Sequence, residues 1–321
     1  MFELDKKIDF SESKFDLLAV GEVLADIISK DLVPSFKEAD EFRRYFGGSP
    51  ANITMNVSSL GAESALLSKV GADGIGEYLM EKLITGGVDV SGVVKSKKHN
   101  TSVVMVTQSK ESPDFIAYRD AEKYIEEADI KENLIDNTKI IHLSTFALSA
   151  PVTRNTLLEV VKLAEKKDKV ISLDPNYRPQ LWEGEEDGVE FIKGLLEKVS
   201  IVKPSLDDAE ALFGAGYSPQ EYIKKFHGLG VELVILTLGA NGVLVSNPQE
   251  GLKLATYAEE VVDTTGAGDA FWSGLYSSLV DGDELKTAIK VGNATAALAL
   301  QQVGALADLP TKDKIIKRFS I

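Results

Sequence analysis

The stretch EEVVDTTGAGDAFWSGLYSSLVDG, residues 259–282, indicates most about the fold of this chain. We expect Val261 and Val262 to end a strand, residues 264–268 to turn, and residues 271–280 to form a helix. Glycine makes tight turns without a Cβ, and a Gly-Ala-Gly run leaves its backbone N–H groups uncovered. These groups and the positive end of the helix dipole then point to one place, which predicts an anion site.

Asp269 lies in the first turn of the predicted helix, beside this anion site. A carboxylate in that position can take a proton from a substrate hydroxyl. An anion hole and a base are two principal parts of phosphoryl transfer, so the stretch predicts ATP-dependent phosphorylation of an alcohol. From these residues alone a second interpretation stays open, in which the glycines only make a turn and Asp269 caps the helix.

Other phosphate-binding motifs fit the sequence less well. It contains no G-x-x-x-x-G-K-[ST] stretch, which excludes a P-loop. The GAGDAF segment has Phe271 where a dinucleotide fingerprint needs Gly or Ala, and it lies late in the chain. These differences disfavour a nicotinamide dehydrogenase. The glycines of GADGIG, residues 71–76, also have the wrong spacing, and a plain turn explains them.

Length and composition narrow the class of protein further. A chain of 321 residues can bury a large core, and we expect one α/β domain with a small appendage. The absence of cysteine excludes disulfides, thiolate zinc sites and cysteine nucleophiles. No signal-like or membrane-spanning apolar stretch opens the chain, so we expect a cytoplasmic protein with no membrane partner. A net charge of −15 disfavours nucleic acid as a partner.

Short apolar runs alternate with helical patterns along the chain. The run FDLLAV (15–20) is predicted to be a buried first strand, and further strands are expected at 64–70, 139–144, 169–174, 200–205 and 233–239. Residues 151–168 have a helical period, with Leu157, Val160, Val161 and Ala164 on one face. This alternation predicts a mainly parallel central sheet with helices on both faces.

Two stretches interrupt this alternation. Residues 26–46 and 93–120 contain β-rich pieces joined by polar turns, and we expect them to form antiparallel excursions that build one small lid. The tail from 286 to 319 is predicted to be helical, with an alanine-rich middle. No repeat, low-complexity tract or linker divides the chain, so a single domain over 1–321 is expected.

The sequence resembles the ribokinase-like, or PfkB, family of carbohydrate kinases. DTTGAGDAF (263–271) is similar to the C-terminal signature of that family, and FGGSPANITMNVSSLG (46–61) is similar to its N-terminal glycine signature. The resemblance runs from about residue 15 to the C-terminus. It implies that Gly266, Ala267 and Gly268 form the anion hole and that Asp269 is the base, in agreement with the interpretation from the residues themselves.

The same resemblance implies a set of sugar-binding residues. Asp26 matches the acid that grips sugar hydroxyls, and Gly47, Gly48 and Asn52 match the glycine turn facing the sugar. FIAYRDAE (115–122) resembles the fructokinase and 2-keto-3-deoxygluconate kinase branch, which implies a substrate contact from Arg119; a solvated surface arginine is the alternative. LDPNYRPQLW (173–182) is similar to a D-x-N-x-R segment and implies two more substrate contacts, Asn176 and Arg178.

ATP and Mg²⁺ are the cofactors that the family implies. KPSLDDAEALFG (203–214) stands where many relatives carry N-x-x-E, but this chain has Ser205 and Asp208 there, which puts individual magnesium contacts in doubt. Asp208 can still hold a hydrated Mg²⁺. The nucleotide-binding candidates are Lys203, for which a surface lysine is the alternative, with Ser205, Thr237, Gly239, Gly242 and Asn293. Asp263 and the Thr265 carbonyl are candidates for a monovalent cation such as K⁺.

The resemblance implies a sugar kinase that phosphorylates a primary hydroxyl. GGSPAN, YRD and GALADLP (304–310) resemble the fructokinase branch, so we expect fructose as the substrate and fructose 6-phosphate as the product. The alternatives within this class are 2-keto-3-deoxygluconate kinase and ribokinase, and an alternative from another class is a sugar-sensing protein without turnover. The lid is also expected to pair with a second copy to form a homodimer.

Overall fold

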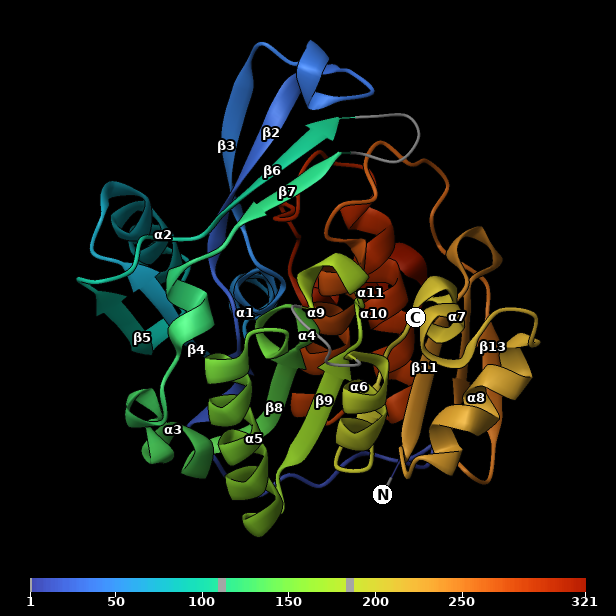
Figure 1. Cartoon of the computed structure of the whole chain (residues 1–321). Helices are drawn as coiled ribbons and strands as arrows, with labels where there is room; N and C mark the ends of the chain where they lie inside the picture. The colour runs from blue at the N-terminus through green and yellow to red at the C-terminus, as the bar shows by residue number, and fades with distance from the viewer. Residues whose placement is uncertain (1, 109–113, 183–187) are drawn as a thin grey trace.

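The computed structural model describes residues 2–108, 114–182 and 188–321, and two β-sheets organise them. The larger sheet has the order β13-β12-β11-β10-β9-β8-β1-β4-β5 (Figure 1). Its neighbouring strands are parallel except for the β11/β12 and β12/β13 pairs. The strands are β1 (Phe15–Val20), β4 (Ser64–Gly71), β5 (Asp89–Ser96), β8 (Thr138–Ser144), β9 (Val170–Asp174), β10 (Ile201–Val202), β11 (Leu233–Thr237), β12 (Val243–Ser246) and β13 (Gly251–Leu254).

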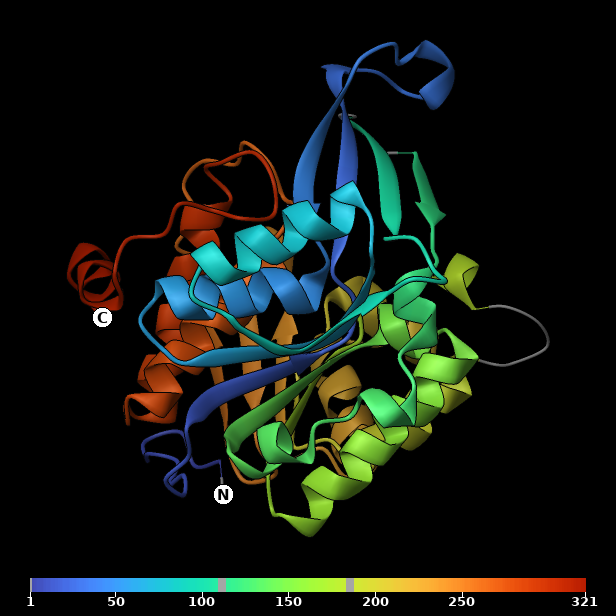
Figure 2. The same ribbon diagram turned by 90° about the vertical axis from the view of Figure 1, so that its left-hand side faces the viewer.

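Helices cover both faces of this sheet, as Figures 1 and 2 show, which confirms the predicted α/β class. One layer contains α1 (Ser49–Ser59), α2 (Gly74–Thr85), α9 (Ala267–Val280) and α10 (Leu285–Ala299). The other contains α3 (Glu132–Asp136), α5 (Pro151–Lys166), α6 (Gly188–Leu196), α7 (Leu206–Phe213) and α8 (Pro219–Gly228). In the described part of the chain, no helix is long and apolar enough to cross a membrane.

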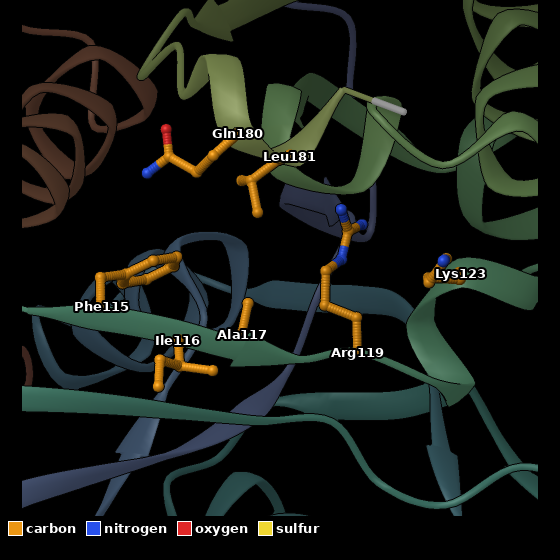
Figure 3. A pocket seen from close by; sticks show the side chains of 7 residues that line it. All are labelled: Phe115, Ile116, Ala117, Arg119, Lys123, Gln180 and Leu181. Carbon is orange, nitrogen blue, oxygen red and sulfur yellow. The ribbon is translucent and has the colours of Figure 1, made fainter. Parts of the chain in front are cut away.

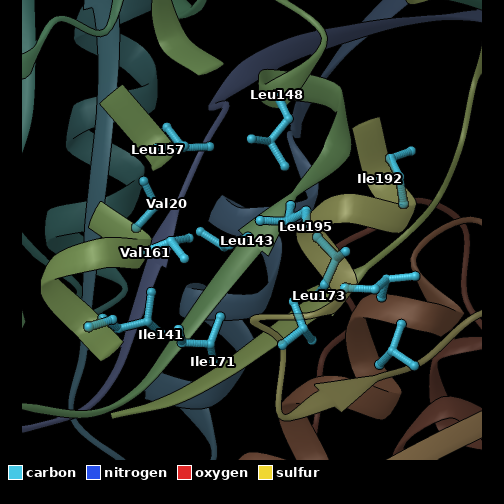
Figure 4. Packing of buried hydrophobic residues seen from close by; sticks show 14 of the residues in the cluster. Val20, Ile141, Leu143, Leu148, Leu157, Val161, Ile171, Leu173, Ile192 and Leu195 are labelled. Carbon is cyan, nitrogen blue, oxygen red and sulfur yellow. The ribbon is translucent and has the colours of Figure 1, made fainter. Parts of the chain in front are cut away.

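The second helical layer packs on the sheet through a continuous apolar core, part of which is drawn in Figure 4. Val20, Leu143 and Leu173 come from the neighbouring strands β1, β8 and β9, and all three are fully buried. Leu157 and Val161 of α5 pack against them, because the apolar stripe of this helix faces the sheet as predicted. This core fixes the parallel strands, so their carboxyl ends form a rigid edge on which loops can carry side chains.

The smaller sheet has the order β3-β2-β6-β7 and projects from the carboxyl edge of the larger one (Figure 1). Its strands are β2 (Leu24–Leu32), β3 (Phe42–Gly47), β6 (Val103–Gln108) and β7 (Phe115–Tyr118). The sheet is mixed, because β2 and β6 are parallel while β2/β3 and β6/β7 are antiparallel. Asp26 pairs with Tyr45 and with Val104, and Val104 pairs with Ala117, so these four side chains share one face, here called the inner face.

The predicted lid therefore exists, but its second segment was placed too early. Residues 93–96 lie in β5, which is parallel to β4 at the edge of the larger sheet and does not belong to the lid. β-branched pieces joined by polar turns suit an edge strand as well as a lid strand, so the pattern cannot separate the two. The expectation for residues 109–113 lies outside the described residues.

Two predictions near the C-terminus were wrong, and a third gave the right element with too late a start. Val261 and Val262 do not end a strand: β13 stops at Leu254, and both valines are more than half exposed in an irregular segment. The predicted helix starts earlier, because α9 begins at Ala267 inside the glycine run. The tail is not one helix, since α10 ends at Ala299 and α11 (Lys312–Phe319) follows an irregular connection. The predicted strand 200–205 is likewise shortened to β10.

The N-terminal segment before β1 lies against the larger sheet and its helices. Phe2, Leu4 and Ile8 are buried in the cluster that contains α9 and α10. The backbone N–H groups of Leu285 and Lys286 donate to carbonyls of this segment, and Asn247 Nδ2 donates to the Phe2 carbonyl at 2.6 Å. Its apolar residues therefore belong to the packed core.

Candidate active site

The start of α9 lies at the carboxyl edge of the sheet. Gly266 is its N-cap residue with φ 75°, in the left-handed region that favours glycine, and no side chain caps the helix there. A Cβ added at Gly266 would lie 2.5 Å from the Ala305 carbonyl oxygen, so only glycine fits beside this neighbour. The Ala267 N–H donates to the Thr264 carbonyl at 3.3 Å, and the first-turn N–H groups that follow it, that of Gly268 among them, are left for a ligand, which is the geometry of an anion site.

Asp269 follows in the first turn of α9, and α1 holds both of its carboxylate oxygens. Ser49 Oγ donates to Asp269 Oδ1 at 2.7 Å, and Asn52 Nδ2 donates to Oδ2 at 3.0 Å. Burial raises the pKa of Asp269 to about 6, while the two hydrogen bonds act to lower it. A carboxyl with this pKa is ionised near neutral pH, and it can still accept a proton from a hydroxyl.

Asp26 stands opposite Asp269, on the inner face of the lid. A Cβ added at Gly47 would lie 2.2 Å from Asp26 Oδ2, so the missing side chain makes room for this carboxyl. Burial first, and then the charge of Asp269, raise the pKa of Asp26 to about 7. Gly48, with φ 97°, turns the chain into α1. The structure thus brings the predicted glycine turn, Asn52 and both acids together.

Lys203 and Asp174 form an ion pair beside the anion site. Lys203 Nζ lies 2.9 Å from Asp174 Oδ2, and it would lie 3.3 Å from a Cβ added at Gly268. Trp272 Nε1 of α9 donates to the same Asp174 oxygen at 2.9 Å. Lys203 is only 4% exposed, so the alternative of a surface lysine is wrong. Its ammonium group is a fixed positive charge next to the amides of α9.

Arg119 lies at the base of the lid, where its guanidinium is held inside the protein. Its Nε donates to Glu122 Oε1 at 2.7 Å and its Nη1 donates to Ser149 Oγ, while Nη2 donates to Glu122 Oε2 and to the Phe146 carbonyl. The side chain is 8% exposed, so the alternative of a solvated surface arginine is wrong. Its charge is largely matched by Glu122, which is fully buried.

Arg119 also lines a pocket of about 370 Å³ between the lid and the body (Figure 3). Phe115 and Ala117 of β7 form one side, and Gln180 and Leu181 form the other, with Arg119 at one end. The predicted contacts Asn176 and Arg178 precede this second side and are both exposed. Residues from the lid and from the loop after β9 therefore border the same space.

Ser205 and Asp208 form a complete capping box at the start of α7. Ser205 Oγ accepts from the Asp208 N–H, and Asp208 Oδ2 accepts from the Ser205 N–H at 3.0 Å. The other carboxylate oxygen accepts from the Tyr177 N–H at 2.9 Å. Burial raises the pKa of Asp208, with the Asp174 charge adding to the effect. Both residues therefore have a structural role in the cap, which occupies Asp208 Oδ2, while Oδ1 accepts one hydrogen bond and keeps a second lone pair.

The nucleotide-binding candidates lie around the β11–β12 connection. Thr237 contacts the Pro204 carbonyl, and Gly239 and Gly242 have φ values of 55° and 84° in the turn that follows. Asn293 of α10 donates from Nδ2 to the Ala255 carbonyl at 2.8 Å, just beyond β13. The amide of Asn293 is thus already hydrogen-bonded to the segment that leads from β13 to α9.

The two candidates for a monovalent cation lie in the loop before α9. Asp263 Oδ1 accepts from the backbone N–H and the hydroxyl of Thr265, and Oδ2 accepts from the Gly304 N–H at 2.9 Å. The carboxylate therefore ties this loop to the connection after α10. Among the described residues, no group of three or more acidic or histidine side chains forms a metal cluster.

Ser49 and Glu22 are site residues that the sequence analysis missed. Glu22 Oε1 accepts from the Ser49 N–H at 3.2 Å and from Ser144 Oγ at 3.2 Å. Burial raises the pKa of Glu22 to about 8, so this carboxyl is mostly protonated at neutral pH. A polar residue inside the glycine turn was the available signal for Ser49, but its contact with α9 spans 220 residues and depends on the fold.

An uncapped helix N-terminus beside a buried acid, on a parallel sheet that carries a small β-lid, defines a phosphotransferase that acts on a hydroxyl group. Residues 14–312 match the family model described as pfkB family carbohydrate kinase, and the chain belongs to that family. It is accordingly a carbohydrate kinase, and the resemblance in its two signatures is confirmed.

Relatives cover nearly the whole chain. It is 46% identical over 321 residues to an ATP-dependent 6-phosphofructokinase of Thermoanaerobacterium thermosaccharolyticum, covering 100% of this chain and 99% of the relative. It is 31% identical over 320 residues to a probable fructokinase-7 of Arabidopsis thaliana. This match covers 96% of this chain and 93% of the relative.

Solved structures agree with this assignment. The Halothermothrix orenii fructokinase superposes with a TM-score of 0.80 at 40% identity, covering 87% of this chain and 98% of that one. A putative ribokinase II from E. coli, solved in complex with ATP and Mg²⁺, superposes with a TM-score of 0.85 at 25% identity. The superposition covers 95% of this chain and 99% of that one. The ribokinase-like fold with a lid is therefore confirmed.

Proposed function

We propose that this kinase phosphorylates fructose to fructose 6-phosphate, with Asp269 as the base. The arrangement at the start of α9 carries the proposal, because an uncapped helix N-terminus and an ionisable carboxyl lie within one turn of each other. The fructokinases of Halothermothrix orenii and Arabidopsis thaliana among its relatives support fructose as the sugar.

Asp269 takes the proton of the sugar hydroxyl as its oxygen forms a bond to the γ-phosphorus of ATP. The bond between that phosphorus and the oxygen bridging to the β-phosphate breaks, and ADP leaves with the bonding electrons. The free first-turn N–H groups of α9, that of Gly268 among them, stabilise the charge on the transferring group, and Lys203 adds a positive charge beside them. Asp26, Asn52 and the glycine turn hold the sugar.

The charges around the proposed sugar site suit a neutral sugar. Asp26 and Asp269 supply carboxyl groups there, and Arg119 is matched by Glu122. A neutral polyol can donate hydrogen bonds to such acids, whereas a carboxylated or phosphorylated sugar requires an additional cation. This balance favours fructose over 2-keto-3-deoxygluconate as the substrate.

Fructose 6-phosphate is a second candidate substrate, favoured by one specific observation. The relative with 46% identity over the whole chain is a 6-phosphofructokinase. That reaction would use the same base and anion site on a different hydroxyl, so the mechanism would stand and only the sugar would change.

ADP release measured with fructose, fructose 6-phosphate, 2-keto-3-deoxygluconate and ribose decides between these substrates. The highest kcat/KM with fructose would support the proposal, and a higher value with fructose 6-phosphate would replace it with the second candidate. Saturable sugar binding without any ADP release would establish a sugar-sensing protein. Asp269→Asn is run beside the native protein to show that turnover depends on this site.

ATP and Mg²⁺ are the proposed co-substrate and metal, supported by the putative ribokinase II complex. We propose that magnesium arrives on the phosphates of ATP, since the oxygens of Asp208 already accept hydrogen bonds from Tyr177 and Ser205. Potassium activation at Asp263 and Thr265 also remains a proposal. Replacing K⁺ with tetramethylammonium would lower kcat if a monovalent cation is required, and would leave it unchanged otherwise.

The lid is also proposed to join two copies of the chain. Ile116 and Tyr118 of β7 alternate with Ala117, so they lie on the face opposite the inner face, where they are 41% and 59% exposed. Sedimentation that shows only monomer at high concentration would remove this proposal. We propose the cytoplasm as the location, because the enzyme needs a supply of ATP.

A further inference from the structure

The contact between α1 and Asp269 carries an inference that rests on the proposed role of Asp269 as the base. Ser49 is the first residue of α1, directly after the Gly48 turn, and its hydroxyl reaches α9 across 220 residues of sequence. It donates to Asp269 Oδ1 at 2.7 Å, which is a well-formed hydroxyl–carboxylate hydrogen bond.

The Ser49 hydroxyl is fixed in place from its own backbone. The Ser49 N–H donates to Glu22 Oε1, which also accepts from Ser144 Oγ at the end of β8. Glu22 is only 3% exposed, so this anchor lies within the packed core. The start of α1 therefore cannot shift easily relative to β8, and the hydroxyl is held toward α9.

Asn52, one turn further along α1, donates to the second carboxylate oxygen of Asp269 at 3.0 Å. The two donors together determine the rotation of the carboxylate, and each oxygen keeps a second lone pair for a substrate. A serine hydroxyl also favours the ionised form of the acid, which is the form that a base needs.

We propose that Ser49 is a positioning residue for the base, which orients the carboxylate of Asp269 and keeps it ionised at neutral pH. The other charged groups around Asp269 act in both directions. Asp174 at the end of β9 and Asp26 on the lid disfavour ionisation, while Lys203 after β10 favours it. Burial is the largest cause that raises the pKa of Asp269, and the hydrogen bonds from Ser49 and Asn52 act against it.

The test is the pH dependence of kcat/KM for the sugar that turns over best, measured for native protein, Ser49→Ala and Ser49→Thr. We expect the acidic limb of the native profile near pH 6, because that is the pKa of Asp269. Loss of the hydroxyl should move this limb upward by about one pH unit, and threonine, which keeps the hydroxyl, should restore it. Ser59→Ala is the matched control, since Ser59 lies exposed at the other end of α1.

If the acidic limbs of the kcat/KM profiles of native protein and Ser49→Ala coincide, the inference is overturned. If Ser49→Ala does not fold, Ser49→Cys carries the test, because a thiol is a weak donor and should give an intermediate shift. Asp269→Asn separates this outcome from failure of the proposed function. Retained activity in Asp269→Asn would refute the base itself, whereas an inactive Asp269→Asn with an unshifted Ser49→Ala profile would refute only the role of Ser49.

Discussion

The helices α7 and α9 both begin near the carboxyl edge of the sheet, but their first turns differ. The N-terminus of α7 is closed by Ser205 and Asp208, which satisfy each other's N–H groups. The N-terminus of α9 begins at Gly266, and no side chain caps it. A capped terminus stabilises the fold, whereas an uncapped one costs stability and leaves its N–H groups for a ligand. The difference makes α9, and not α7, the helix that suits the proposed anion site.

Among the variants that compare the two helix starts, Gly266→Ala is expected to have the largest effect. The new Cβ meets the Ala305 carbonyl at 2.5 Å, and φ 75° strains any residue with a side chain. Because the N–H groups that hold the transferring phosphoryl move, we expect kcat to fall at least about 100-fold. The rate of steady-state ADP release measures kcat of this variant and of the native protein.

Gly282→Ala is the matched control for that variant. Gly282 follows the other end of α9 and has φ 80°, but only Lys7 Nζ, at 3.9 Å, would lie near its Cβ. If Gly282→Ala has similar backbone strain but an unchanged kcat, the loss of kcat in Gly266→Ala is due to its place at the anion site. Equal losses of kcat in both variants would show that the start of α9 has no special role.

Much of this comparison could be predicted from the sequence, because glycines, an acid and an apolar helix stand together in one local stretch. The buried strands were predictable for the same reason, since β1, β4, β8 and β11 each contain a short apolar run. Local pattern also misled: Val261 and Val262 suit a strand by propensity, yet no neighbouring strand pairs with them and they lie exposed.

The contacts between distant segments could not be predicted. Ser49 meets Asp269 across 220 residues, and Glu22 meets Ser144 across 122, so neither pair forms a local pattern. The interior position of Arg119 has the same origin, because its partners Phe146 and Ser149 follow β8. The resemblance to a family identified the types of residue at the site, and only the fold shows how they are held.

Glu22→Gln sharpens the comparison at the start of α1, where the carboxyl accepts from the Ser49 N–H. Because burial raises the pKa of Glu22 from 4.5 to about 8, folding is favoured while this group is protonated, and stability falls as the pH rises from 4.5 through 8. Glutamine has no proton to lose, so the variant should match native protein near pH 5 and exceed its stability at pH 9.

Urea unfolding at pH 5 and pH 9 measures this difference. Asp26 and Asp269 have raised pKa values too, so the free energy of unfolding of Glu22→Gln should still fall between pH 5 and pH 9, but by less than that of the native protein. If the free energy of unfolding falls equally between the two pH values in native protein and in Glu22→Gln, the burial of a protonated Glu22 would be contradicted.

Ser205→Ala is expected to have the smallest effect and tests the capped helix. Loss of the hydroxyl removes one half of the capping box of α7, which should lower the free energy of unfolding by about 1 kcal/mol. Because Asp208 is occupied by the cap, the dependence of kcat on Mg²⁺ concentration should stay unchanged. A marked rise in the Mg²⁺ requirement would instead return this pair to the metal site.

The most direct test of the account is the rate of phosphoryl transfer in Asp269→Asn. Asparagine keeps the shape of the side chain but cannot take a proton, so we expect kcat to fall by about 10² to 10⁴-fold while MgATP still binds with native affinity. That result would establish Asp269 as the base beside the uncapped start of α9. A kcat within a few-fold of the native value would contradict the account.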